Sequence, residues 1–233
     1  MTPNKLSLSL AAAVLAGFAF VPRASATVSV AATFDEKVEK ADAIVLGRVV
    51  RQESRLDESR GMILTYTTLQ IEKTLKGGAP KEVTIVTPGG KVGDLQQTTI
   101  GVPSFERGSE NVVFVRNTKS GPTVLFFDQG AYDVVSERGE KVVRPVASDA
   151  VHIDEQRGMA VAREHPRALR DFESAVRTSV ARARQNRMDV LERQRQKLES
   201  QTSITALLAE NKWLIFAAAL GIALAAIQFI RRH

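Results

Sequence analysis

The sequence predicts a mainly β domain, an antiparallel OB-like barrel or sandwich, followed by a long α-helix and one C-terminal transmembrane helix. Three observations support this fold class. Between residues 43 and 143, short runs rich in β-branched and aromatic residues are separated by glycine and proline turns, without intervening helices. Apolar residues recur near the helical period over residues 166–200. Residues 213–230 form an apolar run interrupted only by one amide, Gln228, near its end.

Residues 1–26 have the features of a cleavable secretory signal. Lys5 supplies the positive start, residues 6–21 form an apolar segment, and Ala24-Ser25-Ala26 is a small-x-small cleavage site. We therefore expect the mature chain to start at Thr27 and its body to be exported. The alternative is an uncleaved first transmembrane helix.

The predicted β domain begins with a short helix over residues 33–41, capped near Thr33. Its expected turns lie at residues 77–80, 88–90, 119–122 and 137–139, where glycine, proline and polar residues cluster. The expected strands cover residues 43–50, 62–71, 82–87, 111–116, 123–127, 131–135 and 141–143.

Residues 88–106 are predicted to form a long surface loop. Loops of this length in compact domains are often functional, so we expect this one to contact a partner. A phosphate-binding P-loop is not indicated, because Lys91 is followed by Val92 and no helix is predicted there. The candidate partner-binding residues are Pro88, Gly89, Gly90, Lys91, Gly93, Pro103 and Phe105.

No catalytic, cofactor or metal site is expected from the sequence. The chain has no cysteine, which excludes a disulfide scaffold, a thiol nucleophile and a cysteine-ligated metal. His152 and His165 stand apart in different contexts, whereas a zinc site needs at least three suitably spaced ligands. There is no Gly-x-Ser-x-Gly nucleophile motif. We therefore predict that the protein is not an enzyme.

Positive charge is concentrated in the segment after the β domain. Residues 27–156 carry 16 basic and 19 acidic side chains, whereas residues 157–199 carry 11 basic and 6 acidic. Phe172 is the single aromatic residue of the basic segment, so a nucleic-acid surface with base-stacking rings is not expected. Candidate contacts to anionic lipid headgroups or surface polysaccharide are Arg182, Arg184, Arg187, Arg193 and Arg195.

This basic segment is predicted to be a helix over residues 166–200, whose first turns pack on the β domain through Leu169, Phe172 and Val176. Its second half is either a solvated stalk or a weak coiled coil. Residues 201–203 suggest a break before the final helix.

The final apolar run is long enough to cross a bilayer, at about 27 Å for 18 helical residues. Trp213 lies where an interfacial aromatic belongs, and Arg231 and Arg232 fit a cytoplasmic end. The alternatives are a buried core helix and a sorting signal that is removed after export. Small residues at four-residue spacing, typical of packed membrane helices, are Ala217, Gly221 and Ala225.

Several short motifs within residues 30–135 resemble an uncharacterised family of exported bacterial β-domains. They are Ala41-Asp42-x-Ile44-Val45-x-Gly47-x-Val49, Leu75-Lys76-Gly77, Thr87-Pro88-Gly89-Gly90 with Gly93, Gly101-x-Pro103-x-Phe105-x-x-Gly108, the strand at residues 112–115, and Gln129-Gly130. The first strand and the lysine-glycine turn are also similar to the netrin-like, OB-type barrel of tissue inhibitors of metalloproteinases. Those inhibitors act through an amino-terminal cysteine and disulfides. This chain has neither, so the resemblance implies a fold and not an inhibitory mechanism.

The expected organisation is a signal peptide (1–26), an exported β-barrel domain (27–150), a linker (151–165), a basic amphipathic helical stalk (166–211) and a transmembrane anchor with a short cytoplasmic tail (212–233). The predicted function is that of a non-catalytic binding or structural module, attached to a bacterial membrane by a single span, with its body on the periplasmic or extracellular side. Its expected partners are membrane lipid and a protein or a second copy of the chain. The alternatives are a regulator or inhibitor of an exported enzyme such as a protease, and a hydrolase with a dispersed site.

Overall fold

The computed structural model describes residues 28–210 and 212–232, so the predicted signal peptide lies outside the described residues. The chain divides into two compact units between Val176 and Arg177. The first unit contains the β domain and the first turns of α3 (Leu169–Glu210). The second contains the rest of α3 and α4 (Lys212–Arg232).

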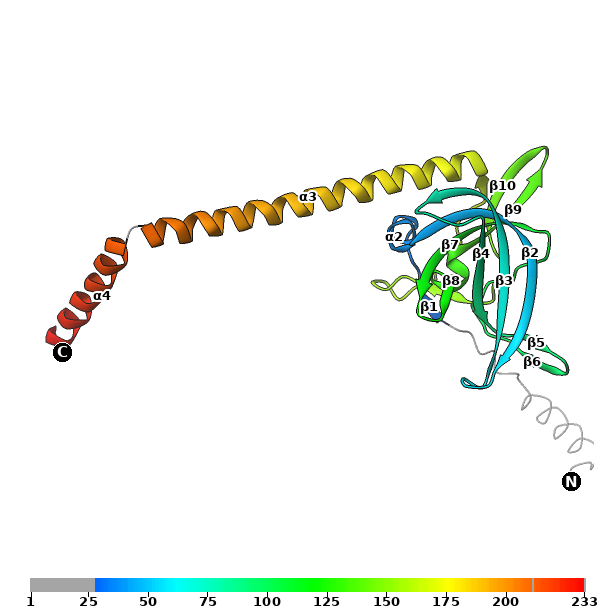
Figure 1. The fold of residues 1–233 in the computed structure, drawn as a ribbon, viewed down its shortest axis with the longest axis horizontal. Coiled ribbons are helices and arrows are strands. Elements are labelled where there is room, and N and C mark those ends of the chain that lie inside the picture. The colour runs from blue at the N-terminus through cyan, green and yellow to red at the C-terminus, as the bar shows by residue number, and fades with distance from the viewer. Residues whose placement is uncertain (1–27, 211, 233) are drawn as a thin grey trace, which may run out of the picture. The chain divides into compact units, whose positions relative to one another are not determined.

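The β domain is built on one eight-stranded sheet, in which every pairing is antiparallel (Figure 1). This confirms the mainly β class. Along the sheet the strands are β12 (Arg167–Ala168), β10 (Glu140–Pro145), β9 (Ala131–Glu137), β7 (Glu110–Thr118), β2 (Ala43–Asp57), β3 (Met62–Lys76) and β4 (Glu82–Pro88), with β8 (Gly121–Val124) paired to β7. Two small sheets accompany it: β5 (Gly90–Val92) with β6 (Leu95–Gln97), and β1 (Val28–Val30) in parallel with β11 (Val151–Ile153).

The sheet approaches closure without forming a closed barrel in the described part of the chain. The Thr123 hydroxyl of β8 donates a hydrogen bond to the Val86 carbonyl of β4 at 3.0 Å. These two strands nevertheless share no backbone ladder: β4 pairs only with β3, and β8 only with β7. A closed barrel, one of the two predicted architectures, is therefore not found.

Strands β2 and β3 are each 15 residues long and exceed the predicted strands. Residues 51–57, which lie between two predicted strands, continue β2, because pairing with β3 satisfies their backbone while their polar side chains remain mostly exposed. Register shifts near Ile44, Leu46 and Val49 mark bulges, which bend a strand pair. At Gly47 a Cβ atom would lie 2.6 Å from the Gln70 carbonyl oxygen, so the bulge requires glycine.

Successive side chains of a strand point to opposite faces of the sheet. Here each face of the sheet carries a core. One face holds a mainly aliphatic core made of Ala43, Val45, Val49, Leu69, Val83, Ile85, Phe105, Val113, Val115, Val124, Ala131 and Val146. The other face holds four packed rings. The Phe172 ring lies 5.4 Å from Phe34, 6.3 Å from Phe114 and 5.0 Å from Tyr132 between centroids.

Helix α2 (Phe34–Lys40) covers this aromatic core and has a cap at each end. The Thr33 side chain accepts a hydrogen bond from the Glu36 amide, which confirms the predicted N-cap. At the other end, the Lys76 ammonium donates to the carbonyls of Val38 and Ala41, each at 2.6 Å, and of Glu39 at 2.9 Å. The lysine-glycine turn that follows β3 therefore stabilises the helix that precedes β2.

Helix α3 is longer than predicted. Residues 167–168 form β12, so the helix begins at Leu169. It continues to Glu210, so the predicted break at residues 201–203 is wrong. Phe172 and Val176 are fully buried, which confirms the predicted packing of the first turns on the β domain, while Leu169 is half-buried.

In the second unit, α4 covers the apolar run at residues 213–230, whereas residues 204–210, predicted to start the same helix, belong to α3. Wherever the exposure of its large apolar side chains is described, they are exposed to solvent. Trp213, Ile222 and Ile230 are examples. Within the described residues, no helix meets the combination of length and apolar character needed to cross a bilayer. Of the predicted helix-packing residues, Ala217, Gly221 and Ala225 all lie on α4 and are exposed.

Candidate functional site

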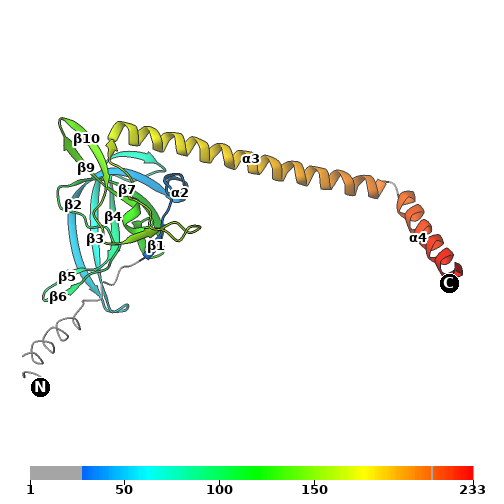
Figure 2. The same cartoon turned by 180° about the vertical axis from the view of Figure 1, so that it is seen from behind.

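A groove lies where the predicted partner-binding loop leaves the sheet, and we call it the loop groove. It has a volume of about 430 Å³, within the range of roughly 300–1,000 Å³ that ligand sites occupy. The β5–β6 hairpin that forms one side lies at the same end of the sheet as the β2–β3 turn in both views (Figures 1 and 2). The groove is lined by Gln52, Ser54, Thr65, Thr87, Pro88, Gly89, Gly90, Lys91, Gln96, Gln97, Thr98, Thr99, Val102, Pro103 and Ser104.

The floor of the loop groove is held by hydrogen bonds. The Thr65 hydroxyl donates to the Gly89 carbonyl at 2.6 Å and lies 2.8 Å from the Ser54 hydroxyl. The Gln97 side-chain oxygen accepts from the Ile63 amide at 2.7 Å. A Cβ atom at Gly90 would approach the Thr65 and Ser54 hydroxyl oxygens to 2.4 and 2.5 Å, so this glycine keeps the floor open.

The rim of the loop groove carries exposed polar side chains. Lys91, Gln96, Thr98 and Ser104 are exposed, and Lys91 is the only charged residue that lines the groove. Hydroxyl and carboxamide groups both donate and accept hydrogen bonds. A fixed floor with such a rim can bind a polar ligand without rearranging the sheet.

Five of the seven predicted partner-binding residues line the loop groove, and two do not. Pro88, Gly89, Gly90, Lys91 and Pro103 line the loop groove. Gly93 does not line it and sits in the β5–β6 turn at a φ of 57°.

The prediction for Phe105 needs correction. Only 3% of this residue is exposed, because its ring packs among the aliphatic core residues. It therefore fixes the loop to the domain and does not reach a partner.

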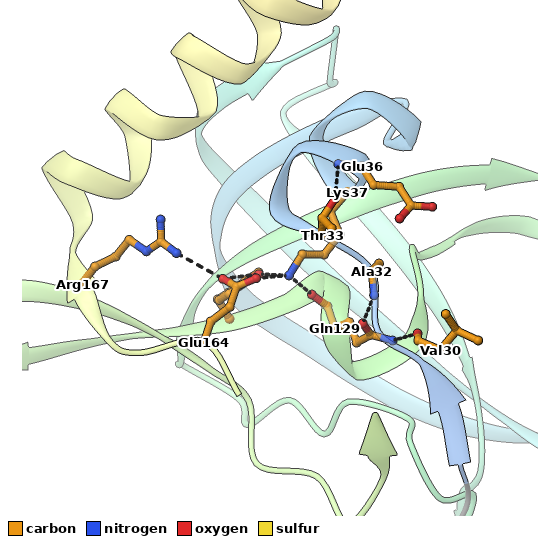
Figure 3. Close-up of polar contacts among 9 residues, drawn as sticks. Val30, Ala32, Thr33, Glu36, Lys37, Gln129, Glu164 and Arg167 are labelled. Carbon is orange, nitrogen blue, oxygen red and sulfur yellow. Dashed lines mark hydrogen bonds and ion pairs between the residues drawn. The ribbon is translucent and has the colours of Figure 1, made fainter. Parts of the chain in front are cut away.

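A second polar cluster surrounds Lys37 of α2, a residue that is only 3% exposed (Figure 3). Its ammonium donates to Glu164 at 2.5 Å, Tyr132 at 2.5 Å and the Gln129 carbonyl at 3.2 Å. Burial lowers the pKa of Lys37, and the nearby Glu164 charge opposes that effect. Burial also raises the pKa of the Tyr132 hydroxyl well above its ordinary value. Since all three ammonium protons have acceptors, Lys37 is arranged as a structural cation and not as a nucleophile.

Gln129 attaches the first strand to this cluster. Its side-chain amide donates to the Val30 carbonyl at 3.0 Å and accepts from the Ala32 amide at 2.7 Å, as a paired strand would (Figure 3). At Gly130 a Cβ atom would lie 2.0 Å from the Leu125 carbonyl oxygen. The Gln129-Gly130 pair therefore serves strand attachment and close backbone packing.

Ser29, His152 and Asp128 form a hydrogen-bonded chain that no motif in the sequence indicates. The Ser29 hydroxyl lies 2.8 Å from His152 Nδ1, and Asp128 lies 3.1 Å from His152 Nε2. An ionised Asp128 only accepts, so a neutral His152 donates from Nε2 and accepts from Ser29 at Nδ1. The chain has the residue types of a catalytic triad, so its surroundings decide what it can do.

The cavity beside this chain is small and does not include the serine. It measures about 90 Å³ and is lined by Asp128, His152, Lys37, Tyr132 and Glu164 among others, but not by Ser29. A nucleophile needs a substrate carbonyl within reach of its oxygen. Because Ser29 and His152 are directly paired in the β1–β11 ladder, their contact stabilises that strand pair.

A charged groove of about 520 Å³ lies elsewhere on the sheet. Glu110 is paired with Lys141 at 2.6 Å, and Asp133 lies 3.8 Å from Arg144. Burial raises the pKa of Asp133, against the opposing effect of Arg144. Because most of its charges, Glu106 excepted, are paired with an opposite charge, this groove is less suited to a charged ligand than an unpaired cluster would be. The described residues contain no group of three or more His, Cys, Asp or Glu side chains that is arranged to hold a metal ion.

The predicted anionic-surface residues Arg182, Arg184, Arg187, Arg193 and Arg195 all lie on α3 in the second unit. Arg195 forms an exposed ion pair with Glu199 at 3.4 Å. Their predicted contact with an anionic surface stays a prediction.

Comparison of this chain with protein-family models, with curated proteins and with solved structures found no match.

Proposed function

We propose that this chain is an exported, membrane-tethered binding module whose β domain recognises a ligand in the loop groove and catalyses no reaction. The observation that carries the proposal is the contrast between the groove's floor and its rim. Ser54, Thr65 and Gln97 are committed to internal hydrogen bonds, whereas the rim side chains are exposed to solvent. Such preorganisation lowers the entropic cost of binding.

The other polar clusters support a role without catalysis. Lys37 is saturated by three acceptors, and Ser29 does not line the neighbouring cavity. Each cluster instead connects segments that are distant in sequence. They keep the domain rigid, which is what a binding scaffold requires.

A groove-filling substitution tests the recognition site. Thr98→Trp places a large ring on the rim, and Thr74→Trp places the same ring at an exposed position of β3 outside the loop groove. The full chain, in lipid nanodiscs, is used to capture components of the native cell envelope. We expect the wild type and Thr74→Trp to retain the same component and Thr98→Trp to lose it. Equal retention by all three would contradict a recognition role for the groove.

We further propose that the apolar run at residues 213–230 anchors the chain in the membrane with the β domain outside, on the strength of its sequence and not of the described helices. The support is the apolar sequence of residues 213–230, which lacks charge, between Lys212 and Arg231. Alkaline carbonate extraction of membranes tests this. The full chain should stay in the pellet, and a chain ending at residue 211 should be released. Release of the full chain by carbonate would overturn the anchor.

A further inference from the structure

We infer that the loop groove binds a neutral, hydroxyl-rich glycan, an inference that rests on the proposed role of the groove as the recognition site. The lining of the groove matches the chemistry of a sugar. Apart from Lys91, its polar side chains are neutral hydroxyls and carboxamides, such as Ser104, Thr98 and Gln96. Each sugar hydroxyl both donates and accepts a hydrogen bond. Side chains with the same double capacity are its natural complement.

A protein partner would need different side chains. Protein interfaces obtain most of their binding energy from buried aromatic and arginine residues. None of these residue types lines the loop groove, whose apolar members are Pro88, Val102 and Pro103 together with two glycines. A protein would therefore find no anchor here. The single lysine likewise gives no track of positive charge for a nucleic acid.

An extended peptide would need a long strand edge to pair with. The strands that form the wall of the groove, β5 and β6, are three residues each and already pair with one another. The Gly89 amide donates to the Ile63 carbonyl at 2.7 Å, and the Gly89 carbonyl accepts from Thr65. The groove thus presents side chains, and its backbone groups at Gly89 are already in use.

The lining also predicts the strength of binding. No aromatic ring lines the groove to stack on a sugar, so binding depends on hydrogen bonds that each contribute modestly in water. A single groove should therefore bind weakly. Many copies tethered to one membrane would engage one polymer together, and such avidity exceeds the single-site affinity by about 10²–10⁴-fold.

The experiment uses the full chain in nanodiscs and in vesicles, with a polysaccharide fraction of the source organism's envelope as the probe. We expect vesicles that carry many copies to retain a component that survives proteinase treatment and is lost after periodate cleavage of vicinal diols. Nanodiscs with one copy should retain at least 100-fold less at equal protein concentration. Thr98→Trp should abolish retention and Thr74→Trp should not.

One further variant and one change of conditions test the chemistry of recognition. Gln96→Ala combined with Thr98→Ala removes two rim hydrogen-bonding groups and should weaken retention by about 10-fold or more. Raising the ionic strength should leave retention unchanged, because a neutral ligand carries no charge that salt would screen from Lys91. Loss of retention at high salt would show an acidic ligand and overturn the inference of a neutral one. Equal thermal unfolding of the variants and wild type establishes that they fold.

The outcomes separate the two proposals. A captured component that is destroyed by proteinase, resists periodate and is lost in Thr98→Trp would leave the groove as the recognition site and reject the glycan. If no component depends on Thr98→Trp, both proposals fail.

Discussion

The ammonium of Lys37 and the carboxylate of Glu164 lie 2.5 Å apart although 127 positions separate them in the chain. Lys37 is on α2, ahead of the first long strand, and Glu164 precedes α3. Arg167 contacts the same carboxylate at 3.3 Å, and its guanidinium carbon lies 5.0 Å from the centre of the Phe34 ring. One buried cation therefore connects the start and the end of the β domain.

Removing this cation should destabilise the domain. Lys37→Met removes the closest donor of Glu164 and leaves it Arg167 and the Tyr132 hydroxyl. Breaking a buried pair costs about 3–5 kcal/mol. Because Glu164 keeps 27% exposure, we expect a loss below that range, about 2–3 kcal/mol, in urea unfolding. Lys40→Met is the matched control, since its pair with Glu36 is exposed and should contribute less than about 1 kcal/mol. Equal losses in the two variants would show that burial of Lys37 is unimportant.

The ionisation of Asp133 should change the free energy of unfolding with pH in a predictable direction. Its pKa is raised in the folded protein, mainly by burial, so its stabilising contribution is complete below the unfolded value near 3.8 and is lost as pH rises through the folded pKa. Asp133→Asn should therefore gain stability relative to the wild type as pH rises from 3.5 to 7. Chemical unfolding across this range measures the difference.

Asp57→Asn is the control, for which the pH dependence of stability should have the opposite sign. The Ser59 hydroxyl lowers the pKa of Asp57, so that carboxylate stabilises the fold above its unfolded pKa near 3.8, and this contribution is lost as pH falls through the folded pKa. This variant should lose stability relative to the wild type as pH rises. The same trend in both variants would contradict the assigned causes.

Gly130 should tolerate no side chain. In Gly130→Ala the new methyl group meets the Leu125 carbonyl oxygen, and relief of such a contact by backbone movement costs about 1–3 kcal/mol or more. The measurement is the midpoint of thermal unfolding, which should fall by several degrees. Gly78→Ala provides the comparison, because its Cβ atom would meet nothing within 4 Å and its φ is not positive. A larger loss at Gly78 would refute the packing argument.

Lys76 should be needed for α2. Its ammonium donates to three carbonyls at the end of that helix. A hydrogen bond to a charged group contributes about 1.5–3 kcal/mol, and less for each bond when three acceptors share one ammonium. Lys76→Met should raise amide hydrogen exchange in α2 and lower the free energy of unfolding by about 2 kcal/mol. Lys119→Met, at an exposed turn, should do neither. Unchanged exchange in α2 would show that the cap is dispensable.

Local patterns in the sequence were sufficient to predict most elements of the β domain. Thr33 marked the start of α2, and glycine and proline marked most turns, because these residues act on the backbone within a few positions. The apolar period likewise placed Phe172 and Val176 on the buried face of α3. Of the four exposed rim side chains of the loop groove, only Lys91 was predicted, because the glycines before it mark the change from β4 to β5.

Other features required the tertiary structure. The polar residues 51–57 extend β2 only because β3 is available to pair with them, and Phe105 is buried because the aliphatic core accepts its ring. Lys37, Tyr132 and Glu164 meet through the packing of three separate segments, and no spacing in the sequence relates them. By itself, therefore, the sequence determined the β class, the turns and the helical register, which depend on near neighbours. Only the tertiary structure decided which polar side chains are buried and bonded and which line an open groove, because burial and pairing depend on residues that are distant along the chain.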